Sequence, residues 1–230
     1  MASGPQDANG RDSEGTDGRR RRILIVDDHP IVRLGMRHLI DAEPDLTICC
    51  EAESAEQALE AARSDRPDLI IVDLSLGAVH GLELVRHLHR ELPQVPVLVL
   101  SMHDEALFAE RVLRAGARGY IMKAQAIGGL LTAVRQVLSG RIYLSERMSQ
   151  LILAGLTRMG EPGTGVRSLT NRELEVFDLV GHGAGTAEIA QRLGVSVKTV
   201  ETYRSNIKTK LGLKDAHELV RYASSWVERP

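Results

Sequence analysis

Three carboxylates, a hydroxyl and an amine lie at the ends of short apolar segments in the N-terminal half of this 230-residue chain. Asp27 and Asp28 follow the first apolar segment, Asp73 and Ser101 end two others, and Lys123 lies just beyond a further one. Carboxylates held close together raise one another's pKa unless a cation lies among them. Short Asp side chains offer the hard oxygen ligands that suit Mg²⁺. These residue types therefore predict a magnesium site.

A carboxylate beside bound Mg²⁺ can attack phosphorus and form an acyl phosphate. The metal and an ammonium such as Lys123 would neutralise charge on the transferred phosphoryl group, and Ser101 could donate a hydrogen bond to one phosphate oxygen. Each residue alone has an ordinary alternative: a single Asp at a strand end is often a helix cap, and a lone Lys is commonly solvated. Only their combination at one rim favours a phosphoryl-transfer site.

The apolar segments that carry these residues are short, continuous and rich in β-branched side chains, as are strands buried on both faces of a parallel sheet. Five strands are predicted, at Ile23–Val26, Leu46–Cys50, Leu69–Val72, Val97–Leu100 and Gly119–Met122. Helical spacing follows each of them, at 30–41, 54–64, 81–91, 104–115 and 126–138. The alternation predicts a doubly wound α/β domain, whose ligands bind beyond the carboxyl ends of the strands.

The chain divides further into a tail and a connector. Residues 1–22 are polar and have almost no apolar side chains, which predicts a disordered tail because little surface could be buried. Residues 23–139 hold the α/β domain. Residues 140–165 are predicted to be a linker, with a short helix at 145–159 and a flexible break at Gly160–Gly165.

Residues 166–230 have no strand signals and predict a second, smaller domain of four helices. The predicted caps are Thr170 with Glu173, Thr186, Ser196, Gly212 as a stop, and Asp215 with Glu218. The turn between the second and third helices is short and contains glycine, as in a helix-turn-helix.

The third of these helices, at 197–211, is predicted to enter the major groove of DNA. Its apolar residues follow helical spacing and are expected to face the core: Val197, Val200, Ile207 and Leu211. Its outward set mixes cations, hydroxyls, an acid and an amide, which suits phosphate anchoring and base readout: Lys198, Thr199, Glu201, Thr202, Ser205, Asn206, Lys208 and Thr209. Because aromatic residues make up only 3% of the chain, duplex DNA is favoured over single strands or RNA.

Charge differs between the two parts of the chain. Residues 23–140 hold eleven Lys and Arg against seventeen Asp and Glu, a net charge of −6, whereas residues 198–214 carry +4. We expect different partners for each part, and a resting state in which the acidic domain covers the basic helix. The arginines at Arg19–Arg22 are interpreted as a solvated flank of the first strand, with DNA phosphate contact as the alternative.

Location and redox state are predicted from what the chain contains. No apolar run approaches the ~18 residues of a membrane span, and no secretory signal is present, so a cytoplasmic protein without a membrane partner is predicted. Cys49 and Cys50 are the only cysteines. As neighbours they cannot form an ordinary structural disulfide, and we interpret them as buried thiols of a reducing compartment.

Four motifs resemble the receiver domain of two-component response regulators, over about residues 23–139. They are Ile-Leu-Ile-Val-Asp27-Asp28-His, Val-Asp73-Leu-Ser-Leu, Leu-Ser101-Met-His-Asp-Glu and Gly-Tyr120-Ile-Met-Lys123. The resemblance implies a flavodoxin-like fold in which Asp73 accepts a phosphoryl group from a sensor histidine kinase. It also implies self-phosphorylation and self-dephosphorylation as the only catalysis, so the chain is not expected to be an enzyme in any other sense.

The same resemblance assigns roles within the pocket. Asp28, Asp73 and the carbonyl of Ser75 would bind Mg²⁺, with Asp27 assisting through water. Ser101 and Tyr120 would form a switch pair, and Lys123 would contact phosphate. Two departures from the family are Leu76-Gly77, where Met-Pro is frequent, and Ala124, where many receivers have a proline after a cis peptide bond.

Residues 166–228 resemble the LuxR-type DNA-binding domain, through Leu169-Thr-Asn-Arg-Glu-Leu-Glu-Val, Glu188-Ile-Ala-Gln-Arg-Leu and the segment from Val195 to Leu213. A receiver followed by this domain resembles the NarL/FixJ class of transcriptional regulators. Because one recognition helix offers few contacts and two-fold dimers read two half-sites, we expect homodimers on phosphorylation, and RNA polymerase is a further candidate partner. It places Glu201, Thr202 and Ser205 nearest the bases and Lys198, Thr199, Asn206 and Lys208 near the backbone. Tyr203 replaces a frequent His and is expected to pack.

Competing interpretations lack residues that they need. A haloacid-dehalogenase-type phosphatase needs a second Asp two residues after Asp73, where Ser75 stands. A dinucleotide site needs a glycine-rich turn after the first strand. His87 and His89 are spaced wrongly for one zinc site on a helix. An orphan regulator of the same architecture, controlled by protein or ligand binding, remains the alternative, although no acid, hydroxyl or amine of the pocket is lost.

Overall fold

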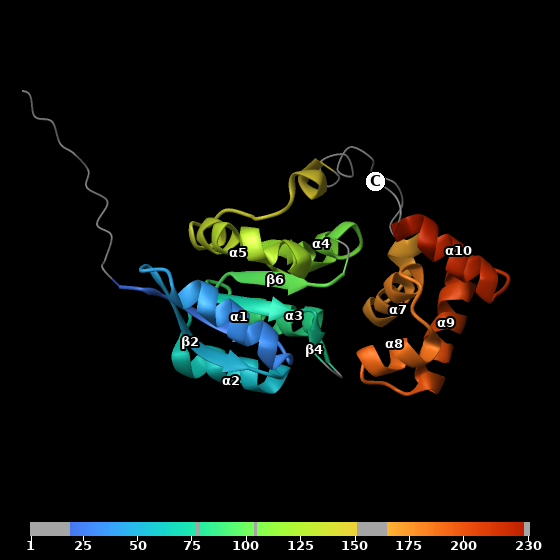
Figure 1. Ribbon diagram of the computed structural model, residues 1–230, viewed down its shortest axis with the longest axis horizontal. Coiled ribbons are helices and arrows are strands. Elements are labelled where there is room, and N and C mark those ends of the chain that lie inside the picture. Colours follow the sequence, from blue (N-terminus) through green and yellow to red (C-terminus); the bar gives the residue numbers. More distant parts are fainter. Residues whose placement is uncertain (1–18, 77–78, 104, 151–164, 228–230) are drawn as a thin grey trace, which may run out of the picture.

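The computed structural model describes residues 19–76, 79–103, 105–150 and 165–227. Its main sheet contains five parallel strands in the order β2-β1-β3-β6-β7. Their bounds are β1 Arg21–Val26, β2 Leu46–Ala52, β3 Leu69–Asp73, β6 Val97–Ser101 and β7 Gly119–Met122. The prediction of a five-stranded, parallel, doubly wound sheet is confirmed, and Figure 1 shows the sheet between its layers of helices.

Two layers of helices cover the two faces of the sheet. α1 (Pro30–Asp41) and α5 (Lys123–Leu138) pack on one face, where the apolar cluster includes Ile23, Ile25 and Ile71. The other face packs against α2 (Ala55–Asp65), α3 (Gly81–Glu91) and α4 (Glu105–Arg114), through a cluster that includes Leu24 and Val72. Successive residues of each central strand thus face opposite clusters, which explains the continuous apolar runs.

Several boundaries differ from the prediction by one to three residues, and two of these differences have identifiable reasons. β1 begins at Arg21 rather than Ile23, because Arg21 and Arg22 pair with β2 and bind Asp68. α5 begins at Lys123 rather than at residue 126. A proline after Lys123 would disfavour helical backbone there, but Ala124 does not. The peptide bonds of the described residues are all trans.

One antiparallel hairpin was not predicted. Its strands, β4 (Ser75–Leu76) and β5 (Val79–His80), follow directly from β3 and lead into α3. The hairpin includes Leu76, the first residue of the position at which the chain departs from many receivers, and Ser75, two residues after Asp73.

The C-terminal domain contains a short 3₁₀ helix, η1 (Gly165–Ser168), and the four predicted helices. These are α7 (Asn171–Gly181), α8 (Thr186–Arg192), α9 (Val197–Leu211) and α10 (Ala216–Val227). Thr170 and Glu173 form the predicted capping box, Ser196 caps α9, and Gly212 ends it in a left-handed conformation at φ 67°. The cap of α8 was wrong: Gly185 occupies that position and Thr186 is the first helical residue.

Parts of the tail and connector lie outside the described residues. These are residues 1–18 of the predicted tail, residues 151–159 of the helix predicted at 145–159, and residues 160–164 of the predicted break. Within the described ranges, no helix has both the length and the apolarity needed to cross a membrane.

Candidate functional site

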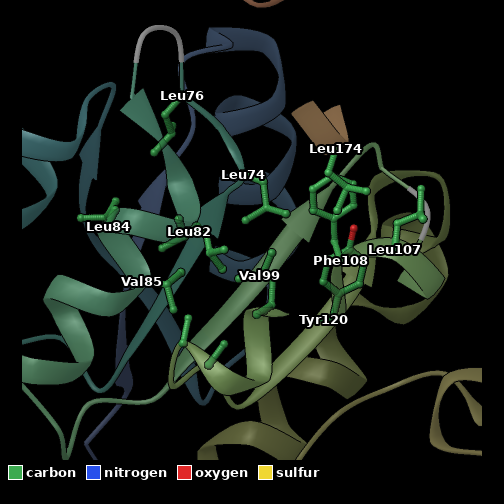
Figure 2. Packing of buried hydrophobic residues seen from close by; sticks show 14 of the residues in the cluster. Leu74, Leu76, Leu82, Leu84, Val85, Val99, Leu107, Phe108, Tyr120 and Leu174 are labelled. Carbon is green, nitrogen blue, oxygen red and sulfur yellow. The ribbon is translucent and has the colours of Figure 1, made fainter. Parts of the chain in front are cut away.

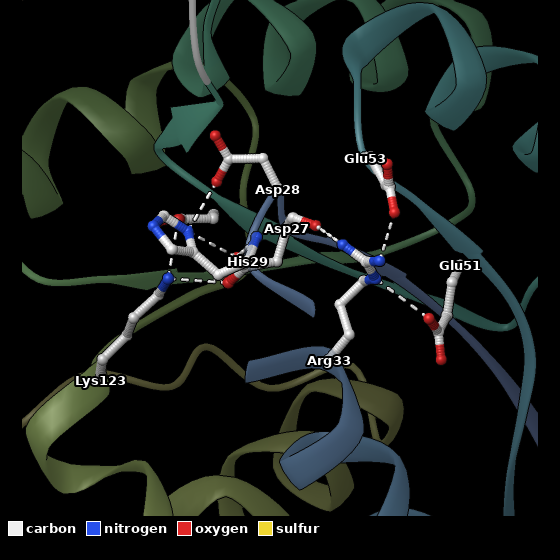
Figure 3. A network of polar contacts seen from close by, with 8 residues as sticks. Asp27, Asp28, His29, Arg33, Glu51, Glu53 and Lys123 are labelled. Carbon is white, nitrogen blue, oxygen red and sulfur yellow. Dashed lines mark hydrogen bonds and ion pairs between the residues drawn. The ribbon is translucent and has the colours of Figure 1, made fainter. Parts of the chain in front are cut away.

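The predicted acidic residues meet at the carboxyl edge of the sheet. Lys123 Nζ lies 2.7 Å from Asp27 Oδ2 and 2.8 Å from Asp73 Oδ2. Asp27 and Asp73 are buried, and Asp28 is half-buried. Figure 3 shows Asp27, Asp28 and Lys123 around the same pocket. The two adjacent acids directly follow β1, β3 ends in Asp73, and α5 begins with the lysine. The strand ends therefore bring together the groups that the sequence predicted.

Burial, together with the neighbouring charge of Asp27, raises the pKa of Asp73 to about 6 despite the lowering effect of Lys123. Burial alone would lower the pKa of Lys123, but the Asp73 and Asp27 carboxylates outweigh it and raise that pKa. The lysine is therefore held as a cation. One ammonium between two buried carboxylates leaves negative charge uncompensated, which is the condition for binding a further cation.

Two oxygen atoms fit this requirement. Asp28 Oδ1 and Asp73 Oδ1 are buried and accept no hydrogen bond from the described residues, although His29 Nδ1 lies 2.7 Å from Asp28 Oδ1. Ligand atoms from Asp27, Asp28, His29 and Asp73 lie within 4.8 Å of one another, the only such group in the described part of the chain. A buried acceptor without a partner is costly, and a hard divalent cation satisfies carboxylate oxygens of this kind. The donor set fits Mg²⁺.

His29 is a member of this cluster that the sequence analysis did not select. Its Nδ1 atom lies 2.7 Å from Asp28 Oδ1 and 3.2 Å from Asp27 Oδ1. Its backbone N–H donates to Asp27 Oδ1 at 2.8 Å. The sequence signal was its position directly after the two acids, where it also precedes the first helix.

A buried arginine behind the pocket was also missed. Arg33 Nη1 donates to the Asp27 carbonyl at 2.6 Å, Nε donates to Glu51 at 3.0 Å, and Nη2 contacts Glu53 (Figure 3). One guanidinium thus ties the end of β1 to the end of β2 and to the residue beyond it. Arginine suits this position because its planar fork presents several donors in fixed directions.

The predicted switch residues are buried and are joined through one loop residue. The His103 backbone N–H donates to Ser101 Oγ at 3.1 Å, and the His103 carbonyl accepts a hydrogen bond from Tyr120 OH at 2.7 Å. Tyr120 is fully buried in this structure.

The side chain of His103 connects this loop to the C-terminal domain. Its Nδ1 atom lies 2.7 Å from Asp178 Oδ2 of α7, and its Nε2 atom lies 3.3 Å from Ser75 Oγ. Burial alone would lower the pKa of His103, but Asp178, Glu175 and Asp73 together raise it. His103 therefore favours its cationic form between acids of both domains. No pattern in the sequence indicated a contact between His103 and Asp178, which lie 75 positions apart.

Apolar and polar contacts extend this interface. Leu174 of α7 joins the apolar cluster of Leu107 and Phe108, as Figure 2 shows. Arg111 on α4 donates to Asn171 Oδ1 at 3.1 Å and to the Arg167 carbonyl at 3.2 Å. The acidic domain thus contacts η1 and α7.

The predicted DNA-reading residues lie on the surface of α9. Lys198, Glu201, Thr202, Ser205, Asn206 and Thr209 are exposed, and Thr199 and Lys208 are half-buried. The expectation that the acidic domain covers this helix is therefore wrong for this structure. The acidic domain contacts α7 instead of α9, because buried acids of α7 lie close to His103.

The core side of α9 agrees with the prediction at Val200 and Ile207, which are fully buried, while Leu211 is half-buried. Val197 is 46% exposed, so its assignment to the core was wrong. As the first residue of the helix it projects beyond the packed part of the domain. Tyr203 packs partly against the core, as expected.

Family models match both parts of the chain. Residues 23–135 match the response regulator receiver domain, and residues 167–223 match the bacterial regulatory proteins of the luxR family. The chain belongs to the response regulators with a LuxR-type DNA-binding domain. This response regulator is therefore a transcription regulator of a two-component system, in a regulatory rather than a catalytic family.

Relatives resemble it over most of its length. The transcriptional activator protein ExaE of Pseudomonas putida is 39% identical and aligns with 87% of this chain and 94% of its own. The oxygen regulatory protein NreC of Staphylococcus aureus is 35% identical over 88% and 96%. A solved structure of RcsB from Salmonella enterica, bound to promoter DNA with phosphomimetic BeF3-, is 26% identical with a TM-score of 0.61, over 90% and 100%.

Proposed function

We propose that this response regulator accepts a phosphoryl group on Asp73 from a sensor histidine kinase. The observation that carries the proposal is the difference in environment between the two carboxylate oxygens of Asp73. Oδ2 is held by Lys123 at 2.8 Å, whereas Oδ1 is buried without a hydrogen bond. One oxygen is thus oriented by a cation, while the other has no hydrogen bond and leaves the carboxylate available both to a metal ion and to phosphorus.

In the proposed step, a carboxylate oxygen of Asp73 forms a bond to phosphorus as the bond between phosphorus and the donor's histidine nitrogen breaks. Asp28, Asp73 and the Ser75 carbonyl would hold Mg²⁺, with Asp27 assisting. When bound, the ion neutralises charge that develops on the phosphoryl oxygens. Lys123 supplies a second positive charge at the same place.

Ser101 and His103 would then change their hydrogen bonds in response to the phosphoryl group. A phosphate oxygen is a stronger acceptor than a neutral group, so the Ser101 hydroxyl donates to it and shifts the hydrogen bond from His103 N–H. The loop that carries His103 moves with it, and through Asp178 the change reaches α7. Ser101→Ala should therefore accept phosphate yet abolish the phosphorylation-dependent change in DNA affinity. An intact change in the variant would contradict this route.

The DNA-binding step assigns roles along α9. Lys198, Thr199, Asn206 and Lys208 contact phosphates and fix the register, while Glu201, Thr202 and Ser205 face base edges. Phosphorylation favours a two-fold dimer, since two recognition helices read two half-sites and gain affinity together. RNA polymerase is a further proposed partner at target promoters, and binding to chromosomal DNA would place the protein in the cytoplasm.

The test is labelling with acetyl phosphate and Mg²⁺. The wild-type protein should gain an acid-labile phosphate, and Asp73→Asn should not, because the amide is a poor nucleophile. Asp45→Asn, which changes an exposed acid far from the pocket, is the matched control. Equal labelling of wild type and Asp73→Asn would refute the assignment. No labelling of either would favour a regulator of the same architecture controlled by protein or ligand binding.

A further inference from the structure

The two cysteines of the chain touch in the structure. Cys49 Sγ and Cys50 Sγ are 3.0 Å apart. Successive side chains of a regular strand point to opposite faces of the sheet, so neighbouring cysteines in a strand ordinarily face away from each other. An irregularity in β2 must therefore bring the two sulfurs together.

That irregularity is a β-bulge. Ile23 of β1 pairs with Ile48, but the next residue, Leu24, pairs with Cys50. Cys49 is thus the additional residue, placed between two regular parts of the strand. A bulge of this kind changes the phase of the side chains that follow it.

The packing on either side of the bulge agrees with the change of phase. Ile48 packs under α1 and α5, and Glu51, three residues later, binds Arg33 on α1. In a regular strand an odd separation would put them on opposite faces. Cys50 packs instead into the cluster on the α2 face. The bulge turns Cys49 to the same side, where the sulfurs meet.

The pair is accessible and chemically asymmetric. β2 is an edge strand, and both cysteines are half-buried, which corrects the expectation of buried thiols. The hydrogen bond between them lowers the pKa of the Cys49 thiol and raises that of Cys50. Cys49 is therefore the more readily ionised sulfur, and the thiolate is the form that attacks soft electrophiles.

The geometry favours one class of ligand over a disulfide or a metal ion. Neighbouring Cα atoms are about 3.8 Å apart, below the roughly 4.4–6.8 Å that unstrained disulfides span. A structural zinc ion takes about four ligands, whereas the chain has two cysteines, and the described residues place their acidic cluster elsewhere. A trivalent atom that needs only two sulfur ligands and already carries a third substituent meets neither of these limits: it requires no disulfide geometry and no further protein ligand.

We propose that Cys49 and Cys50 form a vicinal dithiol site that chelates a monosubstituted trivalent arsenical. In the hydrated form R–As(OH)₂, two As–O bonds break and two As–S bonds form. The two thiol protons leave with the hydroxyls as two water molecules. Arsenic stays trivalent and both sulfurs keep their oxidation level, so no oxidant takes part. The site gives the receiver domain a second ligand at the sheet edge, apart from the phosphoacceptor pocket.

The experiment titrates the full-length protein with phenylarsine oxide and follows intact mass and maleimide-accessible thiols. The wild type should take up one arsenical with loss of both free thiols, reversibly on adding a small dithiol. Cys49→Ser and Cys50→Ser should each bind at least about 100-fold more weakly, because the second bond forms at a high effective concentration. Single-cysteine variants that bind as tightly as wild type would overturn the proposal.

A double variant tests whether the bulge matters. Cys49→Ser with Thr47→Cys keeps two thiols in β2 but places them two register positions of β1 apart, about 7 Å along the strand. It should bind like the single variants, and wild-type affinity would overturn the geometric argument. Circular dichroism checks each fold, and Cys50→Ala replaces Cys50→Ser if serine unfolds the chain. A last measurement adds oxidised glutathione to the wild type while the arsenical is present. If the two cysteines then form an intramolecular disulfide in preference to binding arsenic, the proposal is overturned.

Discussion

His103 Nδ1 lies 2.7 Å from Asp178 Oδ2, and both side chains are buried between the receiver and α7. The same histidine holds the Tyr120 hydroxyl through its carbonyl and Ser101 through its backbone N–H. A single residue therefore belongs both to the loop that follows β6 and to the interface between the domains. This contact fixes the orientation of the DNA-binding domain. It does not cover the recognition helix, since α9 is exposed.

Asp178→Asn should loosen this interface. The amide keeps the shape of the side chain but removes the charge that pairs with His103, and breaking a buried ion pair is strongly unfavourable. We expect a larger radius of gyration by small-angle X-ray scattering. Unphosphorylated DNA affinity should rise about fivefold or more, the range of ordinary allosteric coupling.

Glu188→Gln is the control for this variant, since it removes a carboxylate that binds Arg192 on the surface of the same domain. It should change neither scattering nor affinity. If Asp178→Asn remained folded and left both the scattering and the DNA affinity at wild-type values, the interface would not regulate DNA binding.

The raised pKa of Asp73 makes a prediction about stability. A carboxyl whose pKa is about 6 in the folded chain, against an ordinary 3.8, contributes stability at low pH that is lost as pH rises through 6. At neutral pH without Mg²⁺ the ionised group costs up to about 3 kcal/mol, at 1.36 kcal/mol per pKa unit. Asp73→Asn should therefore unfold at higher urea than wild type at pH 7.5, and the gain should shrink towards pH 5.

Two controls separate this effect from a general one. Asp45 has a lowered pKa because of its hydrogen bond with Arg135, so Asp45→Asn should give no gain at neutral pH. Saturating Mg²⁺ should also reduce the gain from Asp73→Asn, since the ion stabilises wild-type carboxylates. A gain that did not depend on pH or Mg²⁺ would argue against the assigned origin.

Arg33 should position the acidic pair for cation binding. Arg33→Lys retains the charge but cannot reach the Asp27 carbonyl, Glu51 and Glu53 together, so Mg²⁺ affinity by calorimetry should fall several-fold. Indirect supports of metal ligands typically contribute about 10–100-fold. Arg37→Lys is the matched control, because Arg37 binds the same Glu51 without touching Asp27. Equal effects of the two variants would assign Arg33 a role in stability alone.

The sequence predicted the strands, most helices and all the pocket acids because these depend on local apolar runs and on the rule that parallel strands end at one edge. It did not predict the contact between His103 and Asp178, which forms only when two domains pack. The bulge at Cys49 was missed for a related reason, since pairing with β1 determines which residue is additional. Arg33 looked like any polar residue of an amphipathic helix, although its side chain is 9% exposed.

The last prediction distinguishes phosphate contacts from base contacts on α9. Lys198→Ala and Lys208→Ala should each weaken binding to most duplex sequences, and each should reduce the log–log salt slope by about one. Thr202→Ala and Ser205→Ala should alter sequence preference with little effect on that slope. Fluorescence anisotropy between low and physiological salt, on specific and scrambled duplexes, measures both quantities.

Lys210 supplies the internal control on the same helix. Its Nζ lies 2.6 Å from Glu173 Oε2, the acid of the capping box that begins α7. Lys210→Ala removes the same charge as the other two variants, but its amine is already committed to an intramolecular ion pair. It should lower the unfolding midpoint of the DNA-binding domain while leaving the salt slope close to wild type. An equal fall in slope for all three lysines would mean that general charge, rather than the assigned contacts, controls binding.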